Sequence, residues 1–368
     1  MLEHFKKDPV FFVSGILALV SCFFVRPDLE YIGYVDFRVL GILFCMMLVV
    51  AELVRLGVFD RLTNKLLSLV GSSRSVSLIL VWLCFFMGMV LTNDVTLVTM
   101  VPFAIAVMKS FDDRKSLTFT LILMTVAANL GSMQTPIGNP QNIYLYTHYE
   151  MELWDFIKLM FPYSLCSFVL VTASVFLLCS NKKTSRSSLE VKKLSAVPLS
   201  ICILLFIACL LVVAKVVNFL PVLILISLVM FVLDKKAFKY VDYTLLITFV
   251  FFFIFVGNMG RIPFVYSFIS DIVGRSPVLT AVLSSQVISN VPSALLLSVF
   301  TSDGASLVIG TNLGGLGTLI ASMASLITYK FHSALPASKE KTVNYIAAFS
   351  VVNVIFLVIL LGLYYIMP

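Results

Sequence analysis

Two short polar segments interrupt long apolar stretches and carry the residues best suited to chemistry. The first is LTND at 91–94 and the second is ISNVP at 288–292. Each places a hydroxyl residue directly before an asparagine. Hydroxyl and amide oxygens bind hard cations such as Na⁺, and helix N-termini at such breaks bind anions. Both segments are therefore candidate ion-binding tips.

Asp94 is the carboxylate of the first tip, whereas the second tip has Val291 at the matching place. A carboxylate at membrane depth is costly, so it is a functional candidate by default. Asp94 could bind Na⁺ or exchange a proton. The alternative is that it only caps the N-terminus of a helix over 95–110.

Each tip is followed by a run rich in glycine and uncharged polar residues, GSMQTPIGNPQN at 131–142 and GTNLGGLGT at 310–318. The predicted substrate-binding residues are Thr92, Asn93, Gln134, Thr135, Asn139, Ser289, Asn290 and Thr318. The predicted ion-coupling residues are Asn93, Asp94, Asn129, Asn142, Asn290 and Asn312. A Na⁺ site is predicted at Asn93, Asp94, Gly131, Asn290 and Gly314. The alternative is that these residues only cap broken helices.

The composition excludes a soluble protein. The chain has 368 residues, of which 60% are hydrophobic and 12% are charged. Soluble domains have roughly 45–50% apolar and about 25% charged residues. The chain is therefore an all-α polytopic membrane protein with the lipid bilayer as its main partner. The net charge of +7 lies in short loops, where it sets orientation, and does not indicate nucleic acid.

The sequence contains no pattern expected of an enzyme. The seven cysteines lie in or beside apolar runs without CxxC spacing, and the three histidines are scattered. No GxxxxGK[ST] motif occurs, so ATP is not the expected energy source. We expect no cofactor apart from a coupling ion, Na⁺ or H⁺. A channel or a membrane-embedded enzyme remains an alternative of another class.

Several runs are long and apolar enough to cross a membrane. They are 10–25, 37–55, 156–180, 196–216, 219–233, 242–257 and 343–367. Unsatisfied backbone in hydrocarbon costs several kcal/mol per group, so breaks at membrane depth need a protein-lined cavity. We therefore predict re-entrant hairpins at 76–110 and 277–300, and discontinuous helices at 116–147 and 307–330.

Matched residues recur in the same order in the two halves. Arg55 and Arg261 are 206 residues apart, Asn93 and Asn290 are 197 apart, and Asn129 and Asn312 are 183 apart. This order predicts two repeats joined by the helix at 196–216. The odd number of crossings in the first repeat, followed by that helix, makes the repeats inverted.

The charges of the loops predict orientation. Segments 55–75, 181–195 and 234–242 are basic and are placed in the cytoplasm, and acidic 148–155 is placed outside. The N-terminus is then cytoplasmic and the C-terminus is outside. Segments 56–70 and 260–275 are predicted to lie along the membrane surface as amphipathic helices. We expect Glu52 to pair with Arg55, and Arg261 to extend toward the headgroups.

The paired motifs resemble the ion transporter superfamily. The residues that carry the resemblance are LTNDVTLVTMVP, NLGSMQTPIGNPQN, ISNVPSALLL and GTNLGGLGTLIAS, with AELVRLGVFDRLTNKLLSLVG as its interfacial helix. The branch it resembles most is the citrate-transporter-like, arsenite and sodium/proton antiporter group, with divalent anion/sodium symporters as distant relatives. In the dicarboxylate relatives both tips read Ser-Asn-Thr, and here the third position is Asp94 or Val291.

The resemblance implies an elevator-type transporter and a homodimer in a prokaryotic plasma (inner) membrane. Residues 1–75 and 181–276 would form the scaffold, the latter including the linker helix, and 76–180 and 277–368 would form the transport domain. The expected function is ion-coupled transport of a small anion, a di- or tricarboxylate or an inorganic oxyanion. The alternative is a Na⁺/H⁺ antiporter or an arsenite efflux permease.

Overall fold

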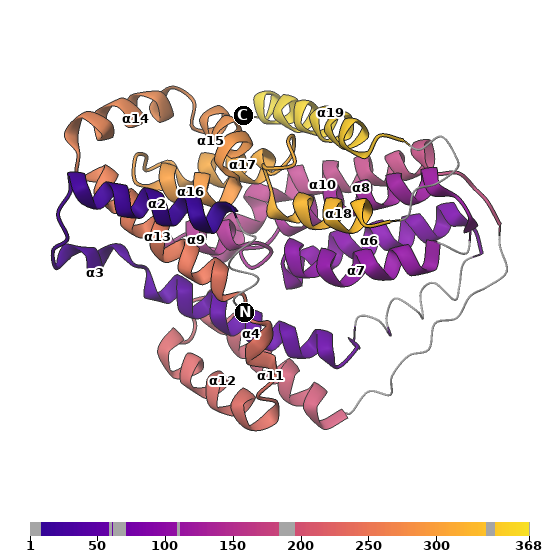
Figure 1. Cartoon of the computed structure of the whole chain (residues 1–368), viewed down its shortest axis with the longest axis horizontal. Helices are drawn as coiled ribbons and strands as arrows, with labels where there is room; N and C mark the ends of the chain where they lie inside the picture. The colour runs from indigo at the N-terminus through magenta and orange to yellow at the C-terminus, as the bar shows by residue number, and fades with distance from the viewer. Residues whose placement is uncertain are drawn as a thin grey trace.

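The chain is helical throughout the parts that its computed structural model describes, residues 9–58, 61, 71–108, 111–183, 196–335 and 343–367. These contain seventeen α-helices and a short 3₁₀ helix, and no strand (Figure 1). The elements are α2 (Pro9–Phe24), α3 (Glu30–Tyr34), α4 (Phe37–Arg55), α6 (Ser73–Leu91), α7 (Asn93–Met108), α8 (Arg114–Ser132), α9 (Pro140–His148), α10 (Leu153–Leu178), α11 (Ala196–Val213), α12 (Phe219–Leu233), η2 (Ala237–Tyr240), α13 (Tyr243–Gly260), α14 (Pro263–Arg275), α15 (Pro277–Ile288), α16 (Asn290–Ser298), α17 (Gly304–Gly314), α18 (Met323–Ser333) and α19 (Tyr345–Ile366).

Six of these helices, α4, α6, α10, α11, α13 and α19, are long and apolar enough to cross a membrane. Shorter apolar helices occur at residues 10–24, 93–108, 219–233 and 277–288. The predicted runs at 37–55 and 219–233 coincide with α4 and α12. The expectation of an all-α polytopic membrane protein is confirmed.

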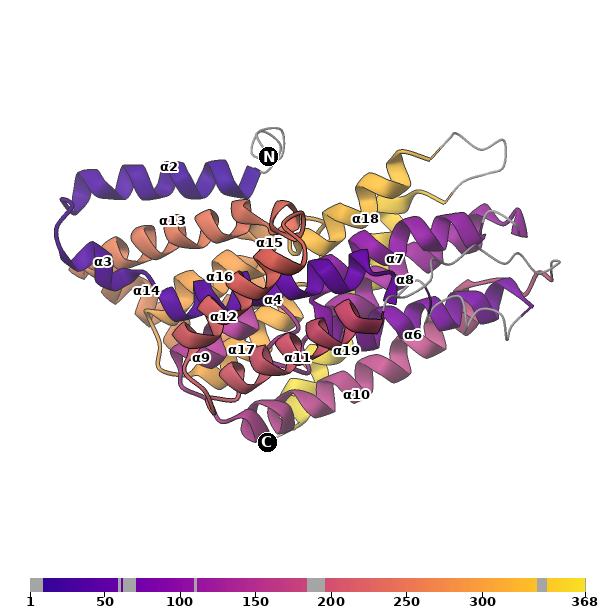
Figure 2. The same ribbon diagram turned by 90° about the horizontal axis from the view of Figure 1, so that it is seen from below.

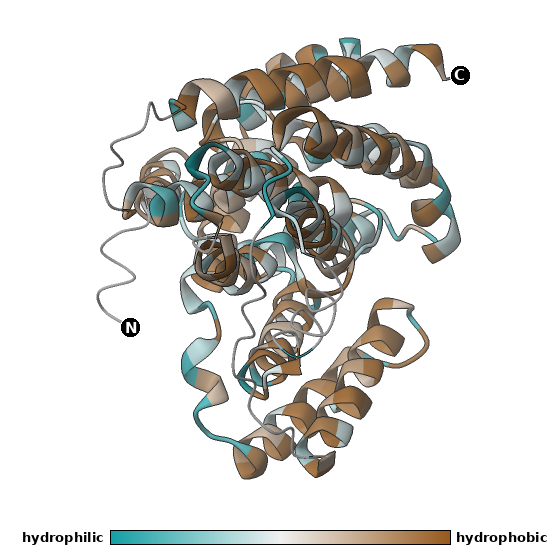
Figure 3. Ribbon diagram, turned by 90° about the vertical axis from the view of Figure 1, so that its right-hand side faces the viewer, coloured by the Kyte–Doolittle hydropathy of each residue, from teal (hydrophilic) through white to brown (hydrophobic). Residues whose placement is uncertain are grey.

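Large apolar side chains cover the outer surface, and polar side chains lie inside. Phe23, Leu177 and Val232 are 81%, 82% and 86% exposed, whereas Asn142, Asn258 and Asn353 are fully buried. Figure 3 shows this in the brown outer faces of the helices and the teal gathered in central loops. Such a surface is stable against lipid and not against water.

Each predicted hairpin is broken at a single residue with a positive φ angle. Thr92 separates α6 from α7 with φ of 94°, and Ser289 separates α15 from α16 with φ of 74°. Non-glycine residues rarely adopt this region, so the turn has to be held by its surroundings. In both halves the two arms pack against each other. The predicted breaks are confirmed, and the re-entrant course of the hairpins stays a prediction.

Each hairpin packs closely on the broken helix that follows it, α6 on α8 and α15 on α17. A Cβ atom at Gly131 would lie 2.0 Å from the carbonyl oxygen of Phe85, and one at Gly314 would lie 2.6 Å from the Oγ of Ser285. Small residues let membrane helices approach to this distance. These two glycines therefore serve helix packing, and their predicted contribution to a Na⁺ site stays a prediction.

The remaining long helices form two further groups. α4 packs against α11, α12 and η2, while α13 packs against α2 and α3. Figure 2 shows α2 running alongside α13. The predicted surface segment at 260–275 contains α14, on which exposed Phe264 and Phe268 stack. Its position at the membrane surface stays a prediction, and most of the matching segment at 56–70 lies outside the described residues.

Each group contains an arginine cluster, and both clusters link the first half of the chain to the second. Arg55, at the end of α4, pairs with Glu52 at 2.9 Å, as predicted, and with Asp234, which follows α12. Its guanidinium also lies 5.7 Å from the ring centroid of Tyr240. Residues 55 and 234 belong to different halves, so this cluster ties the halves together.

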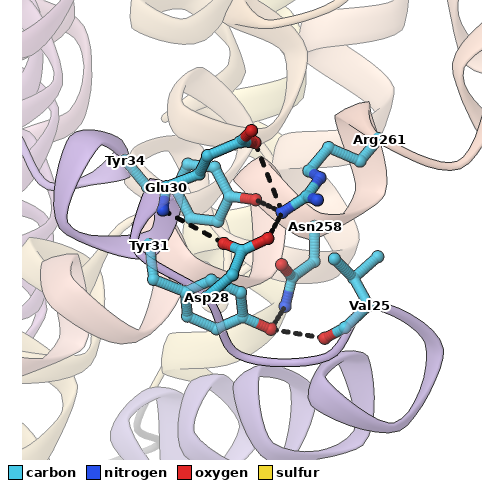
Figure 4. Close-up of polar contacts among 7 residues, drawn as sticks. All are labelled: Val25, Asp28, Glu30, Tyr31, Tyr34, Asn258 and Arg261. Atoms are coloured by element: carbon cyan, nitrogen blue, oxygen red, sulfur yellow. Dashed lines mark hydrogen bonds and ion pairs between the residues drawn. The ribbon is translucent and has the colours of Figure 1, made fainter.

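The second cluster repeats the first with the halves exchanged. Arg261, after α13, pairs with Asp28 at 2.8 Å and Glu30 at 3.4 Å, and donates to the Tyr34 hydroxyl at 3.0 Å (Figure 4). Asp28 and Tyr34 precede Asp234 and Tyr240 by 206 residues, the separation of the two arginines. Arg261 therefore binds carboxylates of the protein, where the sequence analysis had expected it to extend toward headgroups.

Candidate functional site

The two tips meet at one pocket. Asn93 and Asp94 line it from the first tip, and residues 289–292 line it from the second. The cavity has a volume of about 50 Å³. The other lining residues are Val10, Pro140, Gln141, Asp242, Leu245, Thr248, Ser322 and Met323. The pocket therefore brings together residues from both hairpins and both broken helices.

The N-terminal ends of five helices converge on this pocket. They belong to α7, α9, α13, α16 and α18, and each contributes its first turn or its capping residue to the lining. The first turn of a helix has unpaired N–H groups and carries about half a positive charge. Five such ends in one place favour an anion.

Two carboxylates, Asp94 and Asp242, oppose this positive field. Among the described residues that line the pocket there is no lysine, arginine or histidine. An anion here would rely on backbone N–H groups, amides and hydroxyls, while a cation would be attracted by the carboxylates. The lining therefore offers groups suited to an anion and groups suited to a cation.

The first tip is fixed by its asparagine. The Asn93 N–H donates to the Gly138 carbonyl at 3.1 Å, and its Nδ2 donates to Asn129 Oδ1 at 2.9 Å. α7 begins at Asn93, and the Thr92 hydroxyl accepts from the Val95 N–H at 3.5 Å. Asp94 therefore lies inside the first turn and is not the N-cap residue considered as its alternative role.

The second tip repeats the backbone contacts and differs in its side chains. The Asn290 N–H donates to the Ala321 carbonyl at 3.0 Å, and Ala321 follows Gly138 by 183 residues. The Asn290 side-chain amide makes no hydrogen bond to the described part of the chain and faces the pocket. A Cβ at Gly315 would lie only 2.9 Å from its Nδ2. This amide is therefore available to a ligand.

Behind the pocket, each broken helix is bonded to the other half. Asn139 Nδ2 donates to Asn312 Oδ1 at 3.0 Å, and the Ser322 hydroxyl donates to Asn129 Oδ1 at 3.1 Å. Residues 139 and 322 immediately precede α9 and α18 and are 183 apart, as are 129 and 312. Asn312 also donates to Asn142 Oδ1 at 2.7 Å. The two halves therefore hold one another by equivalent bonds.

Five of the predicted substrate-binding residues are not part of the pocket lining: Thr92, Gln134, Thr135, Asn139 and Thr318. Gln134 donates to the Ile157 carbonyl at 3.0 Å, Thr135 to the Met89 carbonyl at 2.5 Å and Thr318 to the Gln286 carbonyl at 3.2 Å. These bonds support the breaks and hold them against neighbouring helices. A direct contact of these side chains with substrate stays a prediction.

Four polar residues of the lining were not predicted from the sequence: Gln141, Asp242, Thr248 and Ser322. Two signals were present in the sequence. Asp242 belongs to YVDY at 240–243, which repeats YVDF at 34–37, and Ser322 follows Asn139 by the separation that joins Asn129 to Asn312.

No group of three or more His, Cys, Asp or Glu side chains suited to a metal ion occurs within the described ranges. A cation in the pocket would have to be held by oxygens of a different kind. Asp94, Ser289 and Asn290 supply carboxylate, hydroxyl and amide oxygens there. Na⁺ accepts such ligands, as other hard cations do.

Comparison with known proteins gives a family and several relatives. Residues 5–305 match the citrate transporter family. The chain is 31% identical to an uncharacterized transporter of Methanocaldococcus jannaschii, with 87% of each chain covered. It is 29% identical to the inner membrane protein YbiR of Escherichia coli, with 89% of each covered. Over 30% of this chain and 20% of the other it is 34% identical to a transporter named arsB from Dictyostelium discoideum.

Proposed function

Because the chain belongs to the citrate transporter family, we propose that it is an ion-coupled secondary active transporter of a small anion. The observation that carries the proposal is the pocket in which both hairpin tips meet five helix N-termini and two carboxylates. Discontinuous helices whose ends face a central site are the usual way in which transporters bind anions and coupling ions.

The anion is a di- or tricarboxylate or an inorganic oxyanion. Its oxygens accept hydrogen bonds from N–H groups at the N-terminal ends of α9, α16 and α18, and from the Asn290 amide. Helix ends of this kind favour carboxylate and phosphate-like groups without a basic side chain. The lack of lysine and arginine in the described lining is therefore compatible with an anionic substrate.

The coupling ion is H⁺ or Na⁺, and Asp94 is its binding residue. The carboxylate stands in the first turn of α7, beside Asn93 and across the pocket from Ser289 and Asn290. A bound cation neutralises Asp94 and lowers the repulsion between this carboxylate and the anion. The two solutes then bind more tightly together than alone, which is the thermodynamic basis of coupling.

The transport mechanism is alternating access between two inverted repeats. The reciprocal bonds of Asn139 and Ser322, and the exchanged partners of Arg55 and Arg261, support a two-fold relation between the halves. In the proposed elevator, 76–180 and 277–368 move against a scaffold of 1–75 and 181–276, which also forms a homodimer. The N-terminus is cytoplasmic and the C-terminus is outside, in a prokaryotic plasma membrane.

A second function, efflux of arsenite or exchange of Na⁺ for H⁺, has a specific observation in its favour. Asp94 and Asp242 line the same pocket. Two carboxylates repel a polyanion, whereas they attract a cation and do not repel uncharged arsenite. The name of the arsB relative is compatible with this alternative.

Flux in proteoliposomes tests the proposal. Purified protein is reconstituted, and uptake of labelled citrate, phosphate and arsenite is measured under imposed Na⁺ and pH gradients. We expect saturable uptake of one anion that accumulates only with one of the two gradients. Movement of arsenite alone, or of Na⁺ against H⁺ without an anion, would favour the second function. A flux that does not saturate and ignores both gradients would mean a channel.

A further inference from the structure

Asp242 has an equivalent in the first half of the chain. YVDF at 34–37 and YVDY at 240–243 place Asp36 and Asp242 in the same position, 206 residues apart. Asp36 accepts a hydrogen bond from the Val39 N–H at 2.9 Å, and Asp242 accepts one from the Leu245 N–H at 2.9 Å. Both therefore cap the N-termini of equivalent helices, α4 and α13.

The surroundings of these two carboxylates differ. Asp242 is exposed and lines the pocket together with Asp94 and Asn290. Asp36 is half-buried, and lies close enough to Tyr144 and His148 of α9 to act on both electrostatically. Asp242 therefore lies at the pocket, whereas Asp36 lies at a packed contact between α4 and α9.

The packed contact is built by α9. This helix packs against α4 and against α16. Tyr144 stacks on His148 with 5.3 Å between ring centroids, and its hydroxyl is 2.7 Å from the Ser298 Oγ. Tyr149 donates to the carbonyl of Thr301 at 2.8 Å. These contacts join α9 to the C-terminal end of α16 and to the residues that follow it.

The equivalent pair in the other half, α13 and α18, is not among the closely packed helix pairs of the described residues. α18 corresponds to α9 at the separation of 183 residues, as α13 corresponds to α4 at 206. The pocket lies between α13, which contributes Leu245 and Thr248, and the start of α18, which contributes Met323. Two helix pairs of the same origin are thus closed in one half and separated in the other. Such an asymmetry between equivalent pairs is what one state of an alternating-access transporter shows.

We propose that Asp242 and Asp36 are the entrance carboxylates of the site, one for each side of the membrane, and that they act in turn. In the opposite state α9 separates from α4, so Asp36 lines the pocket, and α18 closes on α13, so Asp242 is covered. The inference rests on the proposed function, because it assigns the two entrances of that transporter.

The chemistry of the entrances follows from their charge. A carboxylate at the mouth of a pocket with low-dielectric walls raises the local concentration of cations. Each aspartate therefore favours entry of the coupling cation, Na⁺ or H⁺, from its own side. The rest of each entrance is uncharged among the described pocket residues, except for Asp94 at the tip.

Thiol labelling from the two sides of the membrane tests the assignment. Single variants Asp36→Cys and Asp242→Cys are made in a cysteine-free chain and treated with a membrane-impermeant maleimide in right-side-out and inside-out vesicles. Asp303→Cys is the matched control, because Asp303 also caps a helix, α17, by accepting from the Ser306 N–H at 3.0 Å, and it is not part of the pocket.

We expect Asp36→Cys and Asp242→Cys to be labelled from opposite sides. Adding citrate with a Na⁺ or pH gradient should raise labelling at one position and lower it at the other, while the control stays constant. Labelling of both from the same side, or changes in the same direction, would overturn the proposal. Absence of any flux in the wild type would instead refute the proposed function, and the sidedness of labelling would still be read.

Charge removal gives a second, independent readout. Asparagine caps helices as well as aspartate does, so Asp36→Asn and Asp242→Asn keep the caps and lose only the charge. Each variant should raise the cation concentration for half-maximal transport by about threefold or more, on its own side only. Asp303→Asn should change neither side. An equal effect of one variant on both sides would contradict the assignment.

Discussion

The two hairpin tips share one backbone arrangement and use their side chains differently. In both, a hydroxyl residue with a positive φ angle ends one helix, and the next asparagine N–H binds the carbonyl of a break. Asn93, however, is bonded to Asn129 behind the pocket, whereas the Asn290 amide faces the pocket. Asp94 adds a charge where the second tip has Val291. The two tips therefore share a backbone conformation but have different functional groups: the first tip carries the Asp94 charge, and the second presents the Asn290 amide to the pocket.

Removing either asparagine tests this division most strongly. Asn93→Ala and Asn290→Ala should both abolish transport without preventing membrane insertion. Asn93→Ala should also lower stability by about 1–3 kcal/mol, because Asn129 loses a buried partner, while Asn290→Ala should leave stability nearly unchanged. Uptake and thermal unfolding of the purified variants measure both effects. Full transport by both variants would mean that these asparagines only stabilise the tips.

The charge of the first tip is tested by Asp94→Asn. The side chain keeps its shape and hydrogen-bonding capacity, so substrate binding should survive while ion-driven accumulation stops. Uptake under separate Na⁺ and pH gradients distinguishes the coupling ions: a Na⁺ site shows Na⁺ dependence at fixed pH in the wild type, and a proton site does not. Wild-type coupling in Asp94→Asn would remove this residue from the mechanism.

The two glycine contacts should differ between the halves. In Gly131→Ala the new methyl group meets the backbone oxygen of Phe85 at 2.0 Å, which cannot move without shifting α6. Stability should fall by about 1–3 kcal/mol. Gly314→Ala should cost less, because the nearest atom is the side-chain Oγ of Ser285 at 2.6 Å. Gly362→Ala, with nothing within 4 Å, is the control in thermal unfolding. Equal stability of all three variants would contradict the packing argument.

Among the arginine clusters, Arg55→Gln should cost more than Arg261→Gln. The Glu52 side chain beside Arg55 is 6% exposed, whereas Asp28 and Glu30 beside Arg261 are 39% and 69% exposed. The loss for Arg55→Gln should be about 1 kcal/mol, since its own side chain is partly solvated. A larger loss for Arg261→Gln would reverse this ranking.

The same cluster predicts a pH effect. Desolvation raises the pKa of Asp234, but hydrogen bonds from Lys236 and Arg55 outweigh it and hold the pKa below its ordinary value of 3.8. A lowered pKa stabilises the folded state above 3.8, and this contribution is lost as the pH falls through the folded pKa. Arg55→Gln should therefore weaken the acid dependence of unfolding in this window. If the free energy of unfolding fell with acid in the same way in Arg55→Gln as in the wild type, Arg55 would not be what lowers the pKa of Asp234.

The smallest effects are expected at the two break threonines. Thr135→Ala removes a hydrogen bond to the Met89 carbonyl, and Thr318→Ala removes one to the Gln286 carbonyl. Each bond contributes about 0.5–1.5 kcal/mol, with the exposed Thr318 at the lower end. Transport rates should fall moderately in both, and more for Thr135→Ala. Complete loss of transport in either would instead indicate direct contact with substrate.

Most helices could be predicted because, in a membrane protein, a long apolar run of sequence indicates a helix that lies within the bilayer. The runs at 37–55 and 219–233 coincide with α4 and α12, and the polar residues at 91–94 and 288–292 mark the breaks at Thr92 and Ser289. Backbone polar groups must be satisfied in lipid, so polar residues within an apolar run carry strong structural information. The short α3 was missed because it has few residues and no buried face.

The residues of the site were only partly predictable. Asn93, Asp94, Ser289 and Asn290 reach the pocket because they belong to the breaks themselves. Asp242 precedes a long apolar helix and resembles any helix cap in sequence, so its place in the pocket depends on how α13 packs against the tips. The arginine partners Asp28 and Asp234 likewise come from the opposite half, and local sequence carries no signal of contacts across so long a distance.

The exchanged arginine clusters constrain how the protein can be made. Arg55 is 179 residues from Asp234, and Arg261 is 233 residues from Asp28. During synthesis α4 enters the bilayer, with Glu52 and Arg55 near its end, long before the ribosome has produced Asp234. The first half therefore lies in the membrane without the Asp234 partner of Arg55 until the second half is inserted. Folding of the first half is then complete only after insertion of the second half, because Arg55 gains Asp234 only at that point.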